Sequence, residues 1–155
     1  MNCFLNSKLF FIGALGIANL INAQTQWVQI QDTIYQVQKG KNTVELEFFI
    51  SEGYHIQANT NVLDWVSPSV LNMETIDALT DVTVCFPESH EIFLEGIEDP
   101  LKVFSNRLLV KVEFSISRIT EPSMLWKGSL WYQACDDKQC FYPRNLPVTL
   151  RLNLD

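Results

Sequence analysis

The chain has 155 residues, a formal net charge of −7 at pH 7 and hydrophobic residues at 47% of its positions. This size is sufficient for one domain with a hydrophobic core. Proteins that bind nucleic acid rely on Lys and Arg to neutralise phosphates, so the acidic balance argues against nucleic acid as a partner.

Residues 1–23 have the pattern of a secretory signal peptide. Lys8 supplies a positive charge, residues 9–17 form an apolar segment, and Ala23 precedes the expected cleavage site. Cleavage leaves residues 24–155 as one domain, and the loss of Lys8 changes the net charge from −7 to −8. The apolar stretch is interrupted by Asn19 and is too short to span a bilayer, so we expect no membrane insertion after cleavage. The expected location is the periplasm or the cell exterior.

Alternating apolar residues predict β-strands along most of the chain. The clearest alternation is in Leu108–Ile116, and Val44–Ile50 and Val148–Leu154 repeat it. No window has a helical period, and about eight or nine short strands separated by turn residues predict an all-β, immunoglobulin-like antiparallel β-sandwich. The weaker strand candidates are Trp27–Val37, Tyr54–Ala58, Val70–Ile76, Asp81–Phe86, Glu91–Leu94, Leu101–Phe104 and Trp126–Ala134.

Cys135 and Cys140 are separated by four residues that suit a tight hairpin, so a disulfide between them is geometrically easy. Export would place them in an oxidising compartment, where disulfides persist. So short a loop removes only about 2 kcal/mol of unfolded-chain entropy, which makes the bond a poor staple. Strand alternation places Cys135 on the same, more polar face as Lys127 and Trp131. We therefore expect the sulfur of Cys135 to be exposed and able to meet a partner.

Three interpretations of the cysteine pair stay open at this point. Spacing alone favours a structural disulfide at a hairpin tip, which is common in secreted proteins. A redox-active pair would instead require a reachable sulfur. A zinc site would need four donors, and His55 and His90 have no ligand spacing relative to the cysteines. We therefore expect no metal and no other cofactor.

The charged residues beside the cysteine pair, and also His55 and Cys85, bear on the thiol chemistry. Asp136 should disfavour a thiolate at Cys135, whereas Lys138 compensates in part. His55 either tunes a nearby thiol or is a structural strand residue. Cys85 is expected to be a small buried hydrophobic residue, and the alternative is a third redox thiol.

The segment Tyr132-Gln133-Ala134-Cys135, followed by Cys140 and Pro143, resembles the amino-terminal periplasmic domain of the thiol:disulfide interchange protein DsbD, also called the disulfide bond corrector domain family. The resemblance extends over roughly residues 26 to 155. Its further support comes from Gly53-Tyr54-His55-Ile56, Phe86-Pro87 and Pro100-Leu101-Lys102-Val103-Phe104.

The resemblance implies an immunoglobulin-like redox domain whose Cys135 and Cys140 are the catalytic pair. It also implies thioredoxin-like redox proteins as partners, with disulfide isomerases or cytochrome maturation proteins further along, and a role as a component of a protein-disulfide reductase. The expected partner-binding or tuning residues are Tyr132, Trp131, Asp136, Pro143 and His55.

The sequence departs from the family pattern at three places. The expected cap over the disulfide, Glu95–Leu101, has no aromatic residue, and His55 and Gln57 stand where tyrosines are expected. The chain stops at Asp155, so the electron donor is expected to be another polypeptide. The competing hypothesis is a non-catalytic secreted β-sandwich that binds a protein or a glycan and has a structural hairpin disulfide.

Overall fold

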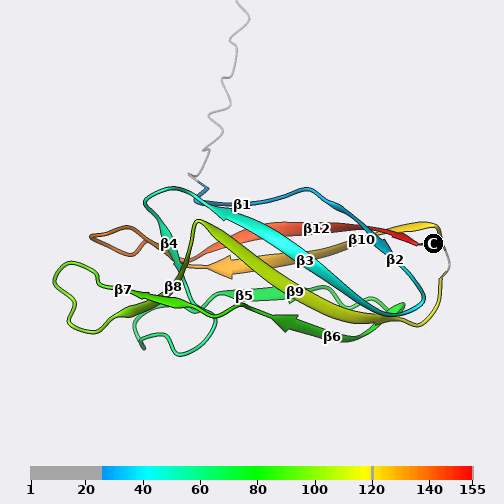
Figure 1. Cartoon of the computed structure of the whole chain (residues 1–155), viewed down its shortest axis with the longest axis horizontal. Coiled ribbons are helices and arrows are strands. Elements are labelled where there is room, and N and C mark those ends of the chain that lie inside the picture. Colours follow the sequence, from blue (N-terminus) through cyan, green and yellow to red (C-terminus); the bar gives the residue numbers. More distant parts are fainter. Residues whose placement is uncertain (1–25, 120, 155) are drawn as a thin grey trace, which may run out of the picture.

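The computed structural model describes residues 26–119 and 121–154, which form twelve strands in three four-stranded sheets (Figure 1). The expected signal peptide lies outside these residues. Sheet A contains, in spatial order, β1 (Val28–Ile30), β3 (Gly40–Ile50), β9 (Arg107–Ile116) and β6 (Leu79–Cys85). Sheet B contains β2 (Ile34–Val37), β12 (Arg144–Leu154), β10 (Ser123–Tyr132) and β5 (Val70–Met73). Sheet C contains β11 (Ala134–Cys135), β4 (His55–Gln57), β8 (Leu101–Ser105) and β7 (His90–Ile92).

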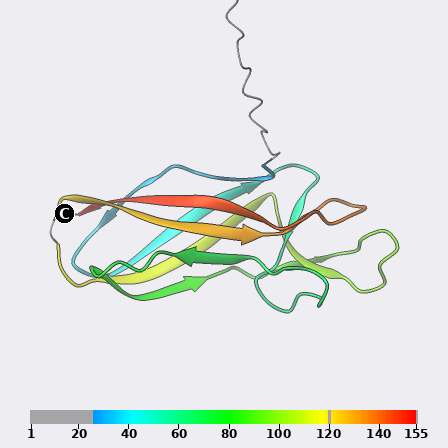
Figure 2. The same cartoon turned by 180° about the vertical axis from the view of Figure 1, so that it is seen from behind.

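Sheets A and B form the two layers of a β-sandwich, with sheet A in front in Figure 1 and sheet B in front in Figure 2. Alternate residues of β3, β9 and β12 point into the space between them, because side chains on a strand alternate between its two faces. The rings of Phe114 on β9 and Trp126 on β10 meet edge to face, with centroids 5.0 Å apart. These contacts join the two layers in one hydrophobic core.

The predicted all-β, immunoglobulin-like sandwich is confirmed, with three differences in detail. β2 pairs with β12 in parallel, whereas the other strand pairs of the described residues are antiparallel. The expected strand Trp27–Val37 is divided into β1 and β2, which belong to different sheets. Trp126–Ala134 is likewise divided at Gln133 into β10 and β11. The described residues therefore contain more strands than alternation predicts, because the chain changes sheet within a single apolar pattern.

Sheet C is built from chain segments that leave the sandwich through short kinks. Gly53, with a φ of 78°, is in the turn from β3 to β4, where the amide of Tyr54 donates to the carbonyl of Ser51 over 3.0 Å. Asn106, with a φ of 61°, connects β8 to β9. Both positions need the left-handed region, which glycine and asparagine adopt most readily. Together with the change at Gln133, these kinks place sheet C at one end of the sandwich (Figure 1).

Candidate functional site

Cys135 and Cys140 are joined by a disulfide at the end of β11, and their Cα atoms are 3.9 Å apart. The two residues also face each other as an antiparallel bridge. Asp136 holds the intervening turn, since its Oδ1 accepts hydrogen bonds of 2.8 Å from the amides of Lys138 and Gln139. These bonds favour the ionised carboxylate and lower the pKa of Asp136 below its usual value. The predicted hairpin and the predicted pairing are both present.

The two sulfurs differ in their access to solvent. Cys135 is completely buried, with 0% of its surface exposed, whereas Cys140 is partly exposed. Cys140 also lines an open pocket of about 430 Å³ together with Gln133, Gln139 and Tyr142. Attack on a disulfide needs a sulfur that a partner can reach, so Cys140 is the accessible end of this bond.

The prediction that Cys135 is exposed is wrong. Tyr132, Gln133, Ala134 and Cys135 are buried in succession, because Gln133 lies between β10 in sheet B and β11 in sheet C. Alternation counted along the sequence through this change of sheet no longer tells which face a residue is on. Cys135 does lie outside the main sandwich core, but loops cover the face of sheet C to which it belongs.

A small hydrophobic cluster covers Cys135. Leu94, Leu101 and Val103 are buried with it, and Ile97 packs against them. The cluster also includes the partly buried Leu63, Ile92 and Cys140. The amide of Glu95 donates to the carbonyl of Asp137 over 3.3 Å, which fastens the loop after β7 to the hairpin.

The segment expected to cap the disulfide, Glu95–Leu101, thus contributes aliphatic side chains to the cluster around the disulfide. Phe93, the aromatic residue just before Leu94, is 72% exposed and does not belong to the cluster. The shield over Cys135 is therefore aliphatic.

Gln57 is the polar residue in contact with the disulfide. Its Nε2 donates to Cys135 Sγ over 3.0 Å and lies 3.8 Å from Cys140 Sγ. The side chain is fully buried, and its Oε1 is without a hydrogen-bond partner in the described part of the chain. In the sequence Gln57 stands where the family pattern leads one to expect a tyrosine, and this position alone predicts no role for it. Strand pairing explains the contact, because Cys135 pairs with His55 and residues two apart on β4 share a face.

His55 is the cross-strand neighbour of Cys135, but its ring takes part in a different network. Its Nδ1 is hydrogen-bonded to Ser105 Oγ, and the same oxygen lies 2.9 Å from His90 Nε2. Burial lowers the pKa of His55 below its ordinary 6.5, and the nearby His90 lowers it further. A histidine kept neutral in this way is a weak source of positive charge for a thiolate.

Gln133 connects the base of the hairpin to a neighbouring loop. Its Oε1 accepts from the amide of Ser67 over 2.6 Å, and its Nε2 donates to the carbonyl of Phe141 over 2.9 Å. The ring of Phe141 in turn packs on Trp27, with centroids 4.5 Å apart. Gln133 belongs to the segment that resembles the family, and its two hydrogen bonds fix the orientation of the hairpin.

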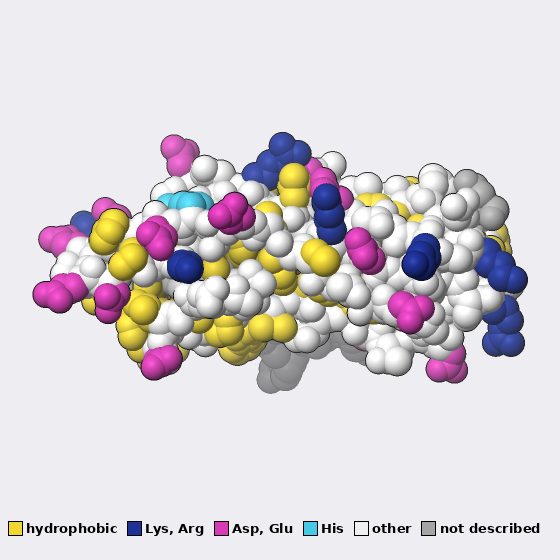
Figure 3. All heavy atoms as spheres, turned by 60° about the horizontal axis from the view of Figure 1, so that its bottom comes forward, with side chains coloured by type: hydrophobic (Ala, Val, Ile, Leu, Met, Phe, Trp, Pro, Cys, Tyr) yellow, Lys and Arg dark blue, Asp and Glu magenta, His cyan; other side chains and the backbone are white. Residues whose placement is uncertain are grey.

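The other predicted site residues lie around this base, in different environments. Tyr132 is fully buried, so it has no surface to offer a docked partner, and burial raises its pKa. Trp131 is 39% exposed and Pro143 is partly exposed, so both are accessible from solvent. Tyr142, beside the pocket, is 92% exposed. Acidic and hydrophobic side chains lie together at the end of the molecule formed by sheet C (Figure 3).

Cys85 is exposed, so the prediction of a buried thiol is wrong. It is the last residue of β6, which is an edge strand of sheet A, and its neighbours on this strand are mostly exposed as well. The apolar neighbours Val84 and Phe86 suggested a core position, but an edge strand has fewer elements to cover it.

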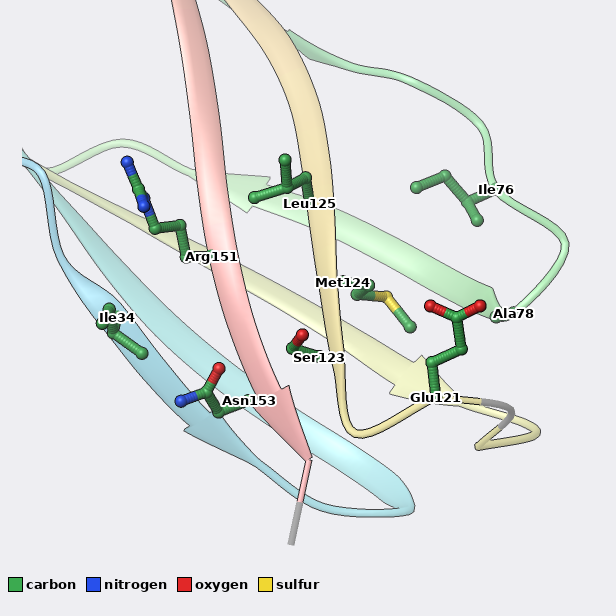
Figure 4. A pocket seen from close by; sticks show the side chains of 9 residues that line it. All are labelled: Ile34, Ile76, Ala78, Glu121, Ser123, Met124, Leu125, Arg151 and Asn153. Atoms are coloured by element: carbon green, nitrogen blue, oxygen red, sulfur yellow. The ribbon is translucent and has the colours of Figure 1, made fainter.

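A larger pocket, of about 610 Å³, is at the opposite end of the sandwich, where the C-terminus lies in Figure 1, and Figure 4 shows the residues that line it. Ile34 from β2, Ile76, and Met124 and Leu125 from β10 contribute most of its apolar lining. Neither cysteine nor histidine lines it, so it is separate from the disulfide chemistry.

The described residues offer neither a cluster of metal ligands nor a helix that could span a membrane. No three His, Cys, Asp or Glu side chains are grouped so that they could hold a metal ion. Nor does any helix in this part of the chain have the length and apolar character needed to cross a membrane.

Comparison with solved structures found similar folds at low sequence identity. The N-terminal periplasmic domain of ScsB from Proteus mirabilis has a TM-score of 0.52 and 14% identity, over 81% of this chain and 44% of that one. The reduced DsbD N-terminal domain of Neisseria meningitidis has a TM-score of 0.43 and 19% identity, over 74% and 78%. The complex between the DsbD and PilB N-terminal domains of Neisseria meningitidis has a TM-score of 0.41 and 17% identity, over 69% of this chain and 73% of that one.

The present chain spans less than half the length of the ScsB chain that it matches. No curated protein sequence matches it. A family model described as the thiol:disulfide interchange protein DsbD, N-terminal, matches residues 24–151 and so includes both cysteines of the disulfide. The chain therefore belongs to the DsbD N-terminal domain family.

Proposed function

We propose that this protein is an exported thiol-disulfide exchange domain that passes electrons through Cys135 and Cys140. The observation that carries the proposal is the unequal exposure of the two sulfurs within a family of thiol:disulfide interchange proteins. Cys140 is reachable from an open pocket, whereas Cys135 is held beneath an aliphatic cover. A disulfide with one accessible sulfur fits an exchange in which the partner attacks that sulfur and the buried sulfur leaves.

The exchange begins at Cys140. A thiolate of the reduced donor attacks Cys140 Sγ and forms a mixed disulfide, the bond between Cys140 and Cys135 breaks, and the electron pair of that bond leaves on Cys135 Sγ. A second thiolate of the donor then attacks the donor's own sulfur in the mixed disulfide and releases Cys140. The donor leaves as a disulfide, and both cysteines take up protons. The reduced pair passes two electrons to an acceptor disulfide by the reverse sequence, with Cys140 as the attacking thiolate.

Thioredoxin-like redox proteins are the proposed partners, as the family resemblance implies. Such a partner must bring its reactive sulfur to Cys140 through the pocket that Gln139 and Tyr142 line. Tyr142 is 92% exposed beside this sulfur, and exposed aromatic residues are enriched where proteins bind one another. Disulfide isomerases or cytochrome maturation proteins are the proposed acceptors further along.

We place the protein in the periplasm, with residues 1–23 as a signal peptide that is removed. The family model begins its match at residue 24, which is the first residue after the predicted cleavage site, and this start supports the proposal. An oxidising compartment also suits a domain with a disulfide.

The competing function is a secreted binding domain with a purely structural disulfide. The two functions differ in whether electrons pass between this protein and a partner. The oxidised protein is mixed with a reduced thioredoxin-like protein, and free thiols are alkylated at intervals and counted by mass. The proposal predicts that Cys135 and Cys140 become reduced as the partner becomes oxidised, and that a variant with both cysteines changed to Ser leaves the partner reduced. A wild-type disulfide that stays intact with every such partner would contradict the exchange function.

A further inference from the structure

We propose that Gln57 is a further catalytic residue, whose side-chain N–H stabilises the negative charge that develops on Cys135 Sγ when the disulfide is broken. This inference rests on the proposed exchange function and assigns one more group to the same site. Its basis is a contact in the structure, since Gln57 Nε2 lies 3.0 Å from Cys135 Sγ and 3.8 Å from Cys140 Sγ.

The surroundings of Cys135 make such a donor necessary. The sulfur that leaves as a thiolate is completely buried, and Leu94, Leu101 and Val103 pack with it. A charge in apolar surroundings is unfavourable unless a hydrogen bond or an opposite charge compensates for it. The N–H of Gln57 supplies that hydrogen bond at the atom where the charge develops.

The backbone of Gln57 is fixed at both of its polar groups. Its amide donates to the carbonyl of Gln133 over 3.0 Å, and its carbonyl accepts from the hydroxyl of Ser69 over 2.5 Å. Cys135 pairs with His55, and Gln57 is two residues further along β4, so the side chain of Gln57 is on the face of sheet C that carries Cys135. The donor is therefore in place before the reaction starts, which is what makes electrostatic stabilisation effective.

The carbonyl oxygen of the same side chain indicates that packing alone does not explain this residue. Gln57 Oε1 is buried and has no hydrogen-bond partner among the described residues. An apolar side chain of similar size would fill the space without leaving a polar atom unsatisfied. A half-turn of the terminal amide after reduction would let this oxygen accept a hydrogen bond from the S–H of Cys135, so the side chain can serve each redox state of the sulfur.

The test compares the rate at which dithiothreitol reduces the disulfide in the full chain and in variants. Gln57→Met keeps a similar volume and removes the donor, and the expected result is a rate about tenfold lower, in line with the loss of a hydrogen bond to a charged group. Leu79→Ala is the control for lost stability, because Leu79 is buried in the main core on β6 and does not belong to the cluster around Cys135. It should lower stability and leave the reduction rate unchanged.

A second variant gives a readout that a structural role would not produce. In Gln57→Glu the protonated acid can donate to the sulfur, whereas the carboxylate only repels the developing charge. The ratio of its reduction rate to that of the wild type should therefore fall as pH rises through the titration of the new carboxyl group.

The outcomes separate this inference from the exchange function. Equal rates for Gln57→Met and the wild type, or a pH-independent ratio for Gln57→Glu, would overturn the role of Gln57. A wild-type protein that dithiothreitol reduces but no thioredoxin-like protein reduces would overturn the exchange function and leave the comparison of variants valid.

Discussion

Cys135 is sealed beneath an aliphatic cluster, whereas Cys140, its disulfide partner, lies partly exposed beside an open pocket. The hairpin holds one sulfur inward and the other outward, so the two have different parts in exchange. An incoming thiolate can reach Cys140, and the electron pair of the broken bond then remains on the protected sulfur. Protection of this kind limits side reactions of the buried thiolate with other disulfides in the surroundings.

Single-cysteine variants test this division of roles. Cys135→Ser leaves the accessible Cys140 as a free thiol. It should form a stable mixed disulfide with a thioredoxin-like partner whose second cysteine is changed to Ser and whose remaining sulfur carries a thionitrobenzoate leaving group. Cys140→Ser leaves the buried Cys135 and should form little of this complex. Non-reducing electrophoresis after mixing with the activated partner measures both. Equal trapping by the two variants, or preferential trapping through Cys135, would contradict the assignment.

If the aliphatic cover limits access to Cys135, a substitution in the cover should change the rate of disulfide reduction as well as stability. A substitution elsewhere in the core should change stability alone. Leu94→Ala removes a buried side chain over Cys135 and should lower the free energy of unfolding by about 2 kcal/mol or more. It should also speed reduction by glutathione, because solvent gains access to the inner sulfur.

Leu79→Ala is the control for this change, since Leu79 has a similar burial in the main core on β6. It should cost comparable stability, measured by urea denaturation, without faster reduction. If both variants are reduced at the wild-type rate, the cover has no part in access.

Gln133 should contribute to stability through its two hydrogen bonds. Gln133→Ala leaves the amide of Ser67 and the carbonyl of Phe141 without these partners, and we expect a loss of about 2 kcal/mol. Gln29→Ala, at an exposed position on β1, should change stability by less than about 0.5 kcal/mol. Urea denaturation of both variants measures the difference, and equal stabilities would show that the hairpin base does not depend on Gln133.

His55 predicts a dependence of stability on pH. Its pKa is lower in the folded protein than its ordinary value of 6.5, because of burial and then of His90. The unfolded chain therefore binds more protons below pH 6.5, so this contribution to stability is present above pH 6.5 and is lost as pH falls toward the folded pKa. Urea midpoints between pH 5 and 7.5 should decline on acidification in the wild type, and the decline should be smaller in His55→Asn. Equal declines of the urea midpoint in the wild type and in His55→Asn would contradict this prediction.

Regular alternation made the sandwich predictable. β3, β9 and β12 each bury every second residue over a long stretch, and such a pattern needs no knowledge of neighbouring strands. The breaks at residues 31–33 and at Gln133 were not predictable in the same way, because the apolar pattern continues through them while the pairing partner changes.

The site was predictable only where it depends on local sequence. The pairing of Cys135 with Cys140 follows from a short hairpin, and the structure contains that disulfide. The contact between Gln57 and Cys135 joins positions 78 residues apart and depends on the pairing of β4 with β11. The cover over Cys135 comes from irregular loop residues such as Leu94 and Ile97, which have no period to mark them.

The reduction potential of the Cys135–Cys140 bond is the most direct test of the proposed function. It is measured by equilibrating the protein in glutathione or dithiothreitol buffers and counting free thiols by alkylation and mass. A relay that exchanges electrons with thioredoxin-like proteins should have a potential between about −270 and −120 mV, the range of such proteins. A value below about −300 mV, typical of structural disulfides, would contradict the account.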